Sequence, residues 1–190
     1  MSAEYKACVG RCGILHICFF LHNEIRGSDV SEKAAAAMEI YKGLIGQEEG
    51  VGQWLEVDQD RINMFADATL DHQFIHIDPV KSSELSPYKV TIAHGFLTLS
   101  LIVHLGESIP PLRPETLDGV FMGVNYGLDK VRFPAPVPVN SKVRARHKIA
   151  DAELKGSNTI QLKREVTVEL EGSDKPVCVA ESLIRYMYAD

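Results

Sequence analysis

The segment TIAHGFLTLSLIVHLG, residues 91–106, decides how the rest of the chain is arranged. From Phe96 to Leu105 it is apolar on nearly every side and contains no acid and no lysine. A helix of this composition is normally surrounded by protein, because a surface helix keeps one polar face. Gly106 is predicted to end this helix, because glycine is common just after the last residue of a helix. The segment therefore predicts a buried helix at the centre of the fold.

The chain that follows this helix is typical of β-strands. Four segments read as strands: residues 120–128, 141–149, 159–170 and 176–188. In the third, apolar residues take alternate places, at Ile160, Leu162, Val166, Val168 and Leu170. The proline-rich residues 133–140 fit a bend between strands. Successive strands with open alternation predict the α+β class, with a curved antiparallel sheet wrapped around the central helix.

Two shorter helices are predicted before the central one. Asp58 can cap a helix over residues 59–68, where apolar residues recur at helical spacing. Asp78 followed by Pro79 is a second helix start, and this helix must end near Ser86 and Pro87. The link between the two helices contains DHQFIH, residues 71–76, which brings three ionisable side chains close together.

Length and composition limit the organisation of the chain. With 190 residues, 45% of them hydrophobic, we expect a single domain over residues 38–190 after a leader of unknown role, residues 1–37. The apolar residues 13–22 are too few to span a membrane, and a targeting segment stays an alternative. A net charge of -6 argues against nucleic acid as a partner. The four cysteines, three of them near the N-terminus, favour a reducing compartment, the cytoplasm.

Two linked motifs carry a family resemblance, FADATLDHQFIHIDP at residues 65–79 and SPYKVTIAHGFLTLSL at residues 86–101. They resemble the hydratase motif of the MaoC-like, (R)-specific enoyl-CoA hydratase family, in particular its branch similar to nodulation protein N. The resemblance implies a hot-dog fold, a homodimer, and acyl-thioester substrates such as an enoyl-CoA bound between sheet and helix. It places the catalytic aspartate on Asp71 and the catalytic histidine on His76.

The chemistry that the resemblance implies needs these residue types. Hydration of a 2-enoyl thioester requires a base for the attacking water and an acid to protonate C2, and a close carboxylate and imidazole can share these tasks. Negative charge on the thioester oxygen needs a hydrogen-bond donor. The resemblance places that contact on the Gly95 N–H, with His94 and Gln73 as further substrate-binding candidates. No cofactor is expected.

Three positions depart from the family pattern: Leu70, Gln73 and Phe74 stand where glycine, asparagine and proline are usual. A leucine at position 70 is costly if the backbone there needs a positive φ. These departures keep open a non-catalytic acyl-thioester binder. A hot-dog thioesterase is another alternative, although the central helix lacks the carboxylate that it would use.

Other polar residues have ordinary interpretations beside functional ones. His72 and His76 have the spacing of a zinc-binding pair, but the glutamate of such motifs is missing, so no metal is expected. Ser100 either contacts a ligand or bonds back to its own helix. Four basic residues on one strand face could hold the phosphates of CoA or form a solvated face: Lys142, Arg144, Arg146 and Lys148. Lys130 and Arg132 are rival candidates.

Overall fold

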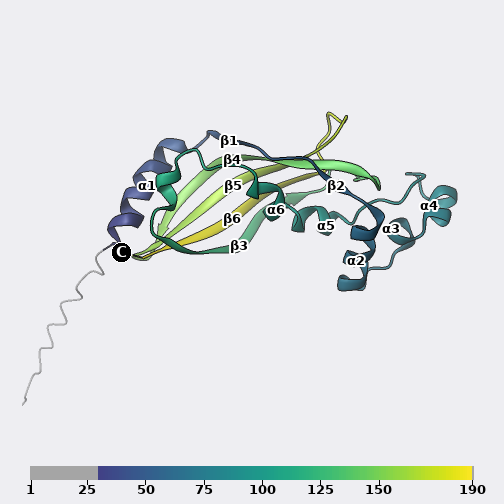
Figure 1. The fold of residues 1–190 in the computed structure, drawn as a ribbon, viewed down its shortest axis with the longest axis horizontal. Coiled ribbons are helices and arrows are strands. Elements are labelled where there is room, and N and C mark those ends of the chain that lie inside the picture. The colour runs from purple at the N-terminus through teal and green to yellow at the C-terminus, as the bar shows by residue number, and fades with distance from the viewer. Residues whose placement is uncertain (1–29, 190) are drawn as a thin grey trace, which may run out of the picture.

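The computed structural model describes residues 30–189, in which a curved sheet carries helices below it and at both of its ends (Figure 1). The helices are α1 (Glu32–Leu44), α2 (Gln59–Thr69), α3 (Phe74–Ile77), α4 (Pro79–Leu85), α5 (Gly95–Ser100), α6 (Ile102–Glu107) and the 3₁₀ turn η1 (Pro114–Leu117). The strands are β1 (Glu48–Val51), β2 (Leu55–Val57), β3 (Val120–Arg132), β4 (Ser141–Lys155), β5 (Thr159–Leu170) and β6 (Cys178–Tyr188).

The sheet is antiparallel throughout, in the order β1-β4-β5-β6-β3, and β2 also pairs with β4. Buried and more exposed residues alternate along β4 and β5, as the sequence predicts for strands with one covered face. A register shift between Ile149 and Asp151 interrupts the β4 pattern. Residues 133–140 form the predicted bend between β3 and β4. The predicted α+β class and antiparallel sheet are confirmed.

The buried apolar residues form two clusters along the inner face of the sheet. One lies among α2, α5, α6 and the strands, and includes Ile62, Leu97 and Leu105. The other lies under α1 and includes Ala34 and Ala37. The helix α1 starts at Glu32 and is capped by Ser31, whose Oγ accepts a hydrogen bond from the Ala34 N–H at 3.2 Å. It therefore begins before Met38, where we expected the domain to start.

Most of the expected leader, residues 1–29, lies outside the described residues. The targeting segment considered for residues 13–22 falls there, as do three of the four cysteines. Within residues 30–189 each helix is too short or too polar to cross a bilayer.

The central helix departs from its prediction in two ways. It consists of two short helices, α5 and α6, joined at Leu101. Leu97 and Leu105 are buried, but Phe96 is 69% exposed and Val103 is 51% exposed. The prediction of a helix enclosed on all sides is wrong for the described chain, because its apolar residues cover two opposite faces and only one meets the sheet.

Gly106 was expected to stop the helix, and it lies inside α6 instead. The imidazole of His147, which comes from β4, packs against this position. A Cβ at residue 106 would lie 2.5 Å from the His147 Cε1 atom, closer than carbon atoms normally approach. The glycine thus allows close contact between α6 and the sheet, which is a packing requirement that helix-stop patterns do not distinguish.

Candidate active site

Local capping fixes the segment that carries Asp71 and His76. Asp58 caps α2 through a 2.8 Å bond from the Arg61 N–H to its Oδ1 atom, as predicted. Asp78 caps α4 in the same way, through the Lys81 N–H at 2.9 Å. Between them, Leu70 takes a left-handed conformation with φ 62° and ψ 20°, so the position does require a positive φ. This turn reverses the chain and directs the following residues back towards α5.

His76 lies on α3 and is 7% exposed. Its Nδ1 atom is 2.7 Å from the Ile92 carbonyl oxygen. Because a carbonyl only accepts hydrogen bonds, Nδ1 carries the hydrogen, and the Nε2 of the neutral ring has a free lone pair. Burial lowers the pKa of His76 and nearby His94 lowers it further, whereas the Ile92 carbonyl and Asp71 raise it. The net direction is downward, so the ring is neutral at pH 7 and can act as a base.

His94 lies directly before α5 and stacks on His76, with ring centroids 3.7 Å apart. Its Nε2 donates a hydrogen bond to the backbone oxygen of Asp71 at 2.9 Å. Its Nδ1 is buried and has no hydrogen-bond partner in the part of the chain that the structure describes. Phe65 packs on the same ring with centroids 5.1 Å apart. His94 therefore joins the loop of Asp71 to the ring of His76.

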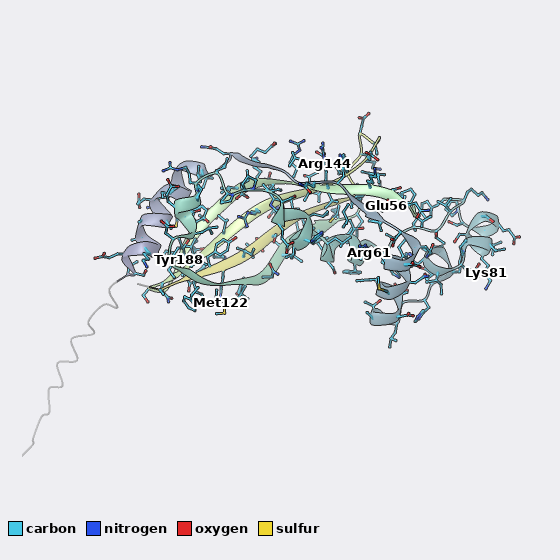
Figure 2. The ribbon with its side chains drawn as sticks, viewed as in Figure 1. Glu56, Arg61, Lys81, Met122, Arg144 and Tyr188 are labelled. Carbon is cyan, nitrogen blue, oxygen red and sulfur yellow. The ribbon has the colours of Figure 1, made fainter. Side chains whose placement is uncertain are left out.

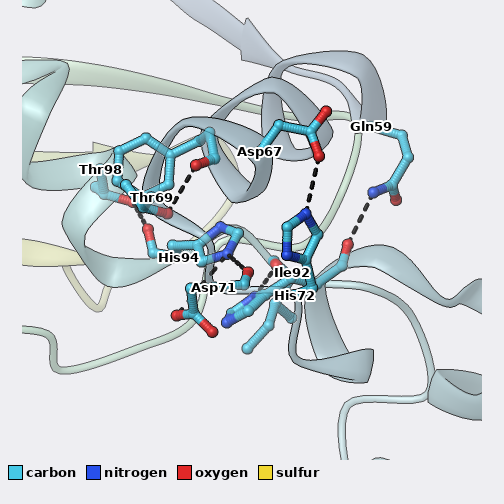
Figure 3. Close-up of polar contacts among 10 residues, drawn as sticks. Gln59, Asp67, Thr69, Asp71, His72, Ile92, His94 and Thr98 are labelled. Carbon is cyan, nitrogen blue, oxygen red and sulfur yellow. Dashed lines mark hydrogen bonds and ion pairs between the residues drawn. The ribbon is translucent and has the colours of Figure 1, made fainter.

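The side chain of Asp71 lies beside the His94 ring (Figure 3). One nitrogen of each ring and one Asp71 oxygen lie within 4.8 Å of one another, and the Asp71 Oδ2 is 4.0 Å from the His94 Nε2. The Asp71 side chain is 57% exposed, while both histidines are buried. The structure thus brings together an open carboxylate and a buried imidazole, which can hold one water molecule between them.

A pocket of about 280 Å³ opens beside this cluster. His76 and Gly95 both line it, and most of the remaining wall is apolar: Tyr88, Ile92, Ala93, Phe133, Ala135 and Val137 are among its residues. Gly95 begins α5, where the first N–H groups have no acceptor inside the helix. A Cβ at residue 95 would lie 2.9 Å from the Phe133 ring, so glycine preserves the shape of this wall.

The sequence did not point to Gln59, which ties the parts of the site together. Its Nε2 donates to the His76 carbonyl oxygen at 2.8 Å, and its Oε1 accepts from the Thr91 hydroxyl at 2.6 Å. One side chain of α2 therefore connects α3 to the segment that leads into α5. The residue sits in the first turn of a predicted helix, and nothing in the local pattern distinguishes it from a surface glutamine.

The structure places the other candidates away from the pocket wall. Gln73 precedes α3, is exposed, and makes no capping bond with its side chain. His72 is on the surface and pairs with Asp67 at 2.8 Å, the ordinary role expected of it. Ser100 donates a hydrogen bond to the Phe96 carbonyl at 2.8 Å, which is the back-bond within its own helix.

By distance alone, Asp71, His76 and His94 could also hold a metal ion. A ligating nitrogen must carry no hydrogen, and one nitrogen of each ring already donates to a carbonyl oxygen. Each imidazole therefore has one nitrogen left for a metal or for a proton.

The basic residues of β4 lie on the outer face of the sheet, away from α5 and α6, as Arg144 shows (Figure 2). Each has a glutamate within 2.6–4.0 Å: this holds for Lys142, Arg144, Arg146 and Lys148. Lys130 pairs with Glu181. The four residues therefore form a paired, solvated face on the side opposite the pocket, and this geometry disfavours them as contacts for substrate phosphates.

Comparisons with known proteins agree with this architecture. A family model described as MaoC like domain matches residues 41–171. The chain belongs to the MaoC-like domain family. A 3-hydroxyacyl-thioester dehydratase Z from Mycobacterium tuberculosis is 46% identical to this MaoC-like domain over 158 residues, 83% of the chain and 95% of the relative. Nodulation protein N from Rhizobium leguminosarum bv. viciae is 47% identical over 137 residues, 72% of the chain and 82% of the relative.

Solved structures resemble the MaoC-like domain in fold. A monoamine oxidase regulatory protein from Archaeoglobus has a TM-score of 0.63 at 20% identity, covering 77% of the chain and 92% of its own. An R-hydratase from Pseudomonas aeruginosa has a TM-score of 0.58 at 21% identity, covering 78% of the chain and 86% of its own. These likenesses confirm the predicted hot-dog fold.

Proposed function

We propose that the protein is a hydro-lyase that interconverts trans-2-enoyl thioesters and (R)-3-hydroxyacyl thioesters. The observation that carries the proposal is the convergence of the Asp71 carboxylate and the buried His76 imidazole beside an apolar pocket. The relationship to a 3-hydroxyacyl-thioester dehydratase at 46% identity supports the same reaction.

In the proposed reaction the Nε2 of His76 takes one proton from a water molecule whose other hydrogen is held by the Asp71 carboxylate. The water oxygen forms a bond to C3, the π electrons between C2 and C3 form a double bond between C1 and C2, and the π electrons of the carbonyl move onto the thioester oxygen to give an enolate. The Gly95 N–H, which lines the same pocket, donates to that oxygen. C2 then takes back the proton that His76 accepted, so that one water molecule has been added.

CoA is the carrier that we propose for the acyl group. Arg132, at the end of β3, directly precedes Phe133 of the pocket wall. Its Nη1 donates to the Val131 carbonyl at 2.7 Å, and within residues 30–189 it has no acidic partner. Unlike the paired cations of β4, Arg132 is therefore available to a phosphate of a ligand bound in this pocket.

We also propose a homodimer, formed through β3 and the exposed side of α5 and α6. The strand β3 is at the edge of the sheet, and nearly all of its residues are exposed on both faces. Its exposed apolar residues are Phe121, Met122, Val124, Tyr126 and Leu128, and Phe96 and Val103 add to this surface. An uncovered apolar edge strand is a site for pairing with another chain. We expect sedimentation equilibrium to give the mass of two chains.

The cytoplasm is the compartment that we propose. Among the described residues the one cysteine is Cys178, a buried thiol whose pKa burial raises to about 11. A thiol in this environment is unreactive and forms no part of the site, in keeping with the cysteine distribution of the whole chain.

One assay tests the reaction. The protein is incubated with crotonyl-CoA while the absorbance of the conjugated thioester and the release of free thiol are followed together. We expect the absorbance to fall without thiol release and the product to be (R)-3-hydroxybutyryl-CoA by chiral chromatography. Thiol release would identify a thioesterase, and binding without either change would identify a non-catalytic acyl-thioester binder.

A further inference from the structure

A second pocket, of about 210 Å³, lies on the inner face of the sheet under α6. It is built from α6 and from strands β3 to β6, whereas the Asp71 cluster lies at the start of α5. Polar side chains make up much of its wall: Asn125, His147, Arg164, Ser182 and Tyr186. In the alternation of β5, Arg164 takes an inward place between Leu162 and Val166, where an apolar residue is expected. The otherwise apolar inner face therefore carries several polar groups at this place.

Arg164 is paired with an acid, and the other charged residue that lines this pocket, Glu107, is also an acid. Arg164 donates to Glu49 through two nitrogens, at 2.5 and 3.0 Å, and its Nη1 donates to the Tyr186 hydroxyl at 3.2 Å. Burial opposes the charge of Arg164, but the bonds with Glu49 more than compensate and raise its pKa. Burial and the adjacent guanidinium lower the pKa of His147 to about 4. At pH 7 the pocket thus holds a neutral imidazole beside an internally paired arginine.

Hydrogen-bonding capacity remains in the wall after these pairs have formed. The Nε2 of His147 is buried and lacks a hydrogen-bond partner within residues 30–189. Arg164 has five N–H groups, and three of them account for the bonds to Glu49 and Tyr186. Asn125 and Ser182 contribute an amide and a hydroxyl. Buried polar groups of this kind favour a ligand that can donate or accept a hydrogen bond.

Pockets follow one another from the Asp71 cluster to this site along α5 and α6. The first includes Gly95 and Thr98. A middle pocket begins at Leu99 and shares Ile102, Val103, Asn125 and Ser182 with the pocket under α6. An unbroken helix from Gly95 to Gly106 would cover about 16 Å, which sets the scale of the path past the joint at Leu101. The pocket at Gly95 and the middle pocket share no lining residue. The acyl chain of the inference passes between them along α5, so that its far end reaches the pocket under α6.

We infer that the pocket under α6 receives an uncharged polar group, a hydroxyl or a carbonyl, carried near the far end of the acyl chain. The inference rests on the proposed function only in placing the thioester at Gly95. Because Arg164 is neutralised by Glu49, a terminal carboxylate is disfavoured in comparison with a hydroxyl. The preferred substrates are therefore functionalised acyl thioesters of medium length.

The test compares matched ligands by isothermal titration calorimetry on the full chain. The ligands are saturated acyl-CoAs of about ten, twelve and fourteen carbons, a range set by the length of the helical path, with methyl, hydroxyl or carboxyl ends. Saturated chains have no C2–C3 double bond and cannot be hydrated, so that affinity is measured apart from the proposed reaction. We expect the hydroxyl-ended chain of one length to bind about tenfold more tightly than the methyl-ended chain, a difference of about 1.4 kcal/mol.

Substitutions in the wall of the pocket under α6 test whether the hydroxyl end binds there. His147→Leu and Ser182→Ala should each reduce the preference for the hydroxyl end, and Ser182→Ala keeps the test open if the first variant does not fold. Lys148→Leu is the matched control, because Lys148 is the next residue of β4 and faces the outer side. It should leave the preference unchanged.

Three outcomes would overturn the inference: equal affinities at every chain length, tighter binding of the carboxyl-ended chain, or a preference for the hydroxyl end that persists in both His147→Leu and Ser182→Ala. The crotonyl-CoA assay on the same preparation separates this inference from the proposed function. Hydration without any preference for a polar end contradicts the inference alone. A preference without hydration contradicts the reaction and leaves the pocket assignment standing.

Discussion

The imidazole rings of His76 and His94 stack on one another, with their planes inclined by 25° and their centroids 3.7 Å apart. After burial, repulsion from the His94 ring is a further cause of the lowered pKa of His76. The arrangement keeps His76 neutral at pH 7 while its Nδ1 is held by the Ile92 carbonyl. The stack and this hydrogen bond together fix the orientation of the ring.

The first prediction concerns the pKa of His76, measured from the pH titration of its Cε1 proton by nuclear magnetic resonance. His94→Phe keeps a stacked ring and removes a charge that lowers the pKa, so we expect the pKa to rise. Asp71→Asn removes a charge that raises it, so we expect the pKa to fall. Shifts of the same sign in both variants would contradict the arrangement of the three groups.

The second prediction concerns turnover. Asp71→Asn and His76→Ala should each reduce kcat for crotonyl-CoA by roughly 10²- to 10⁴-fold, the usual effect of removing a general acid or base. Circular dichroism should show that both variants fold. His72→Ala is the control, because His72 lies on the same segment and faces the surface. Full activity in either of the first two variants would refute the proposed roles.

The third prediction concerns the pH dependence of the wild-type rate. Hydration needs neutral His76, and burial lowers its pKa from 6.5. The value of kcat/KM should therefore be constant around pH 7 and fall as the pH drops through a pKa below 6.5. A profile that declines already between pH 7 and pH 8 as the pH falls would indicate a different base.

The fourth prediction concerns Gly95. A methyl group at this position would press on the Phe133 ring, which is a side chain and can move into the pocket. Gly95→Ala should thus reduce kcat/KM for crotonyl-CoA by about tenfold or more, with a smaller effect on thermal stability. Adding Phe133→Ala should restore part of the loss. If the double variant is as impaired as Gly95→Ala, the effect arises from the backbone and not from the ring.

The fifth prediction concerns stability. Leu70 is 81% exposed and has φ 62°, so its side chain gains little from packing while its backbone is strained. Leu70→Gly should raise the free energy of unfolding by about 1 kcal/mol in urea titrations. Leu85→Gly is the matched control: this leucine is also exposed but ends α4 without a positive φ, and its replacement should destabilise. Destabilisation by both substitutions would show that the Leu70 turn is not strained.

Patterns among residues close in sequence were enough to predict much of the fold and part of the candidate site. The Asp58 cap, the Asp78–Pro79 start and the alternation in β5 depend on contacts a few residues apart, and each predicted its element. Asp71 and His76 share one short link, and so their closeness also followed from the sequence. The family motif added the roles proposed for them.

Tertiary structure alone decided which distant residues meet and which apolar residues remain uncovered. His94 joins His76 across 18 positions of sequence, and Glu49 meets Arg164 across 115. Phe96 reads as a core residue in sequence but is exposed, because hydrophobicity does not specify the surface that covers a side chain. The physical reason is that capping and alternation arise from local hydrogen bonds and strand geometry, whereas burial and charge pairing depend on how the sheet curves and folds the chain back on itself.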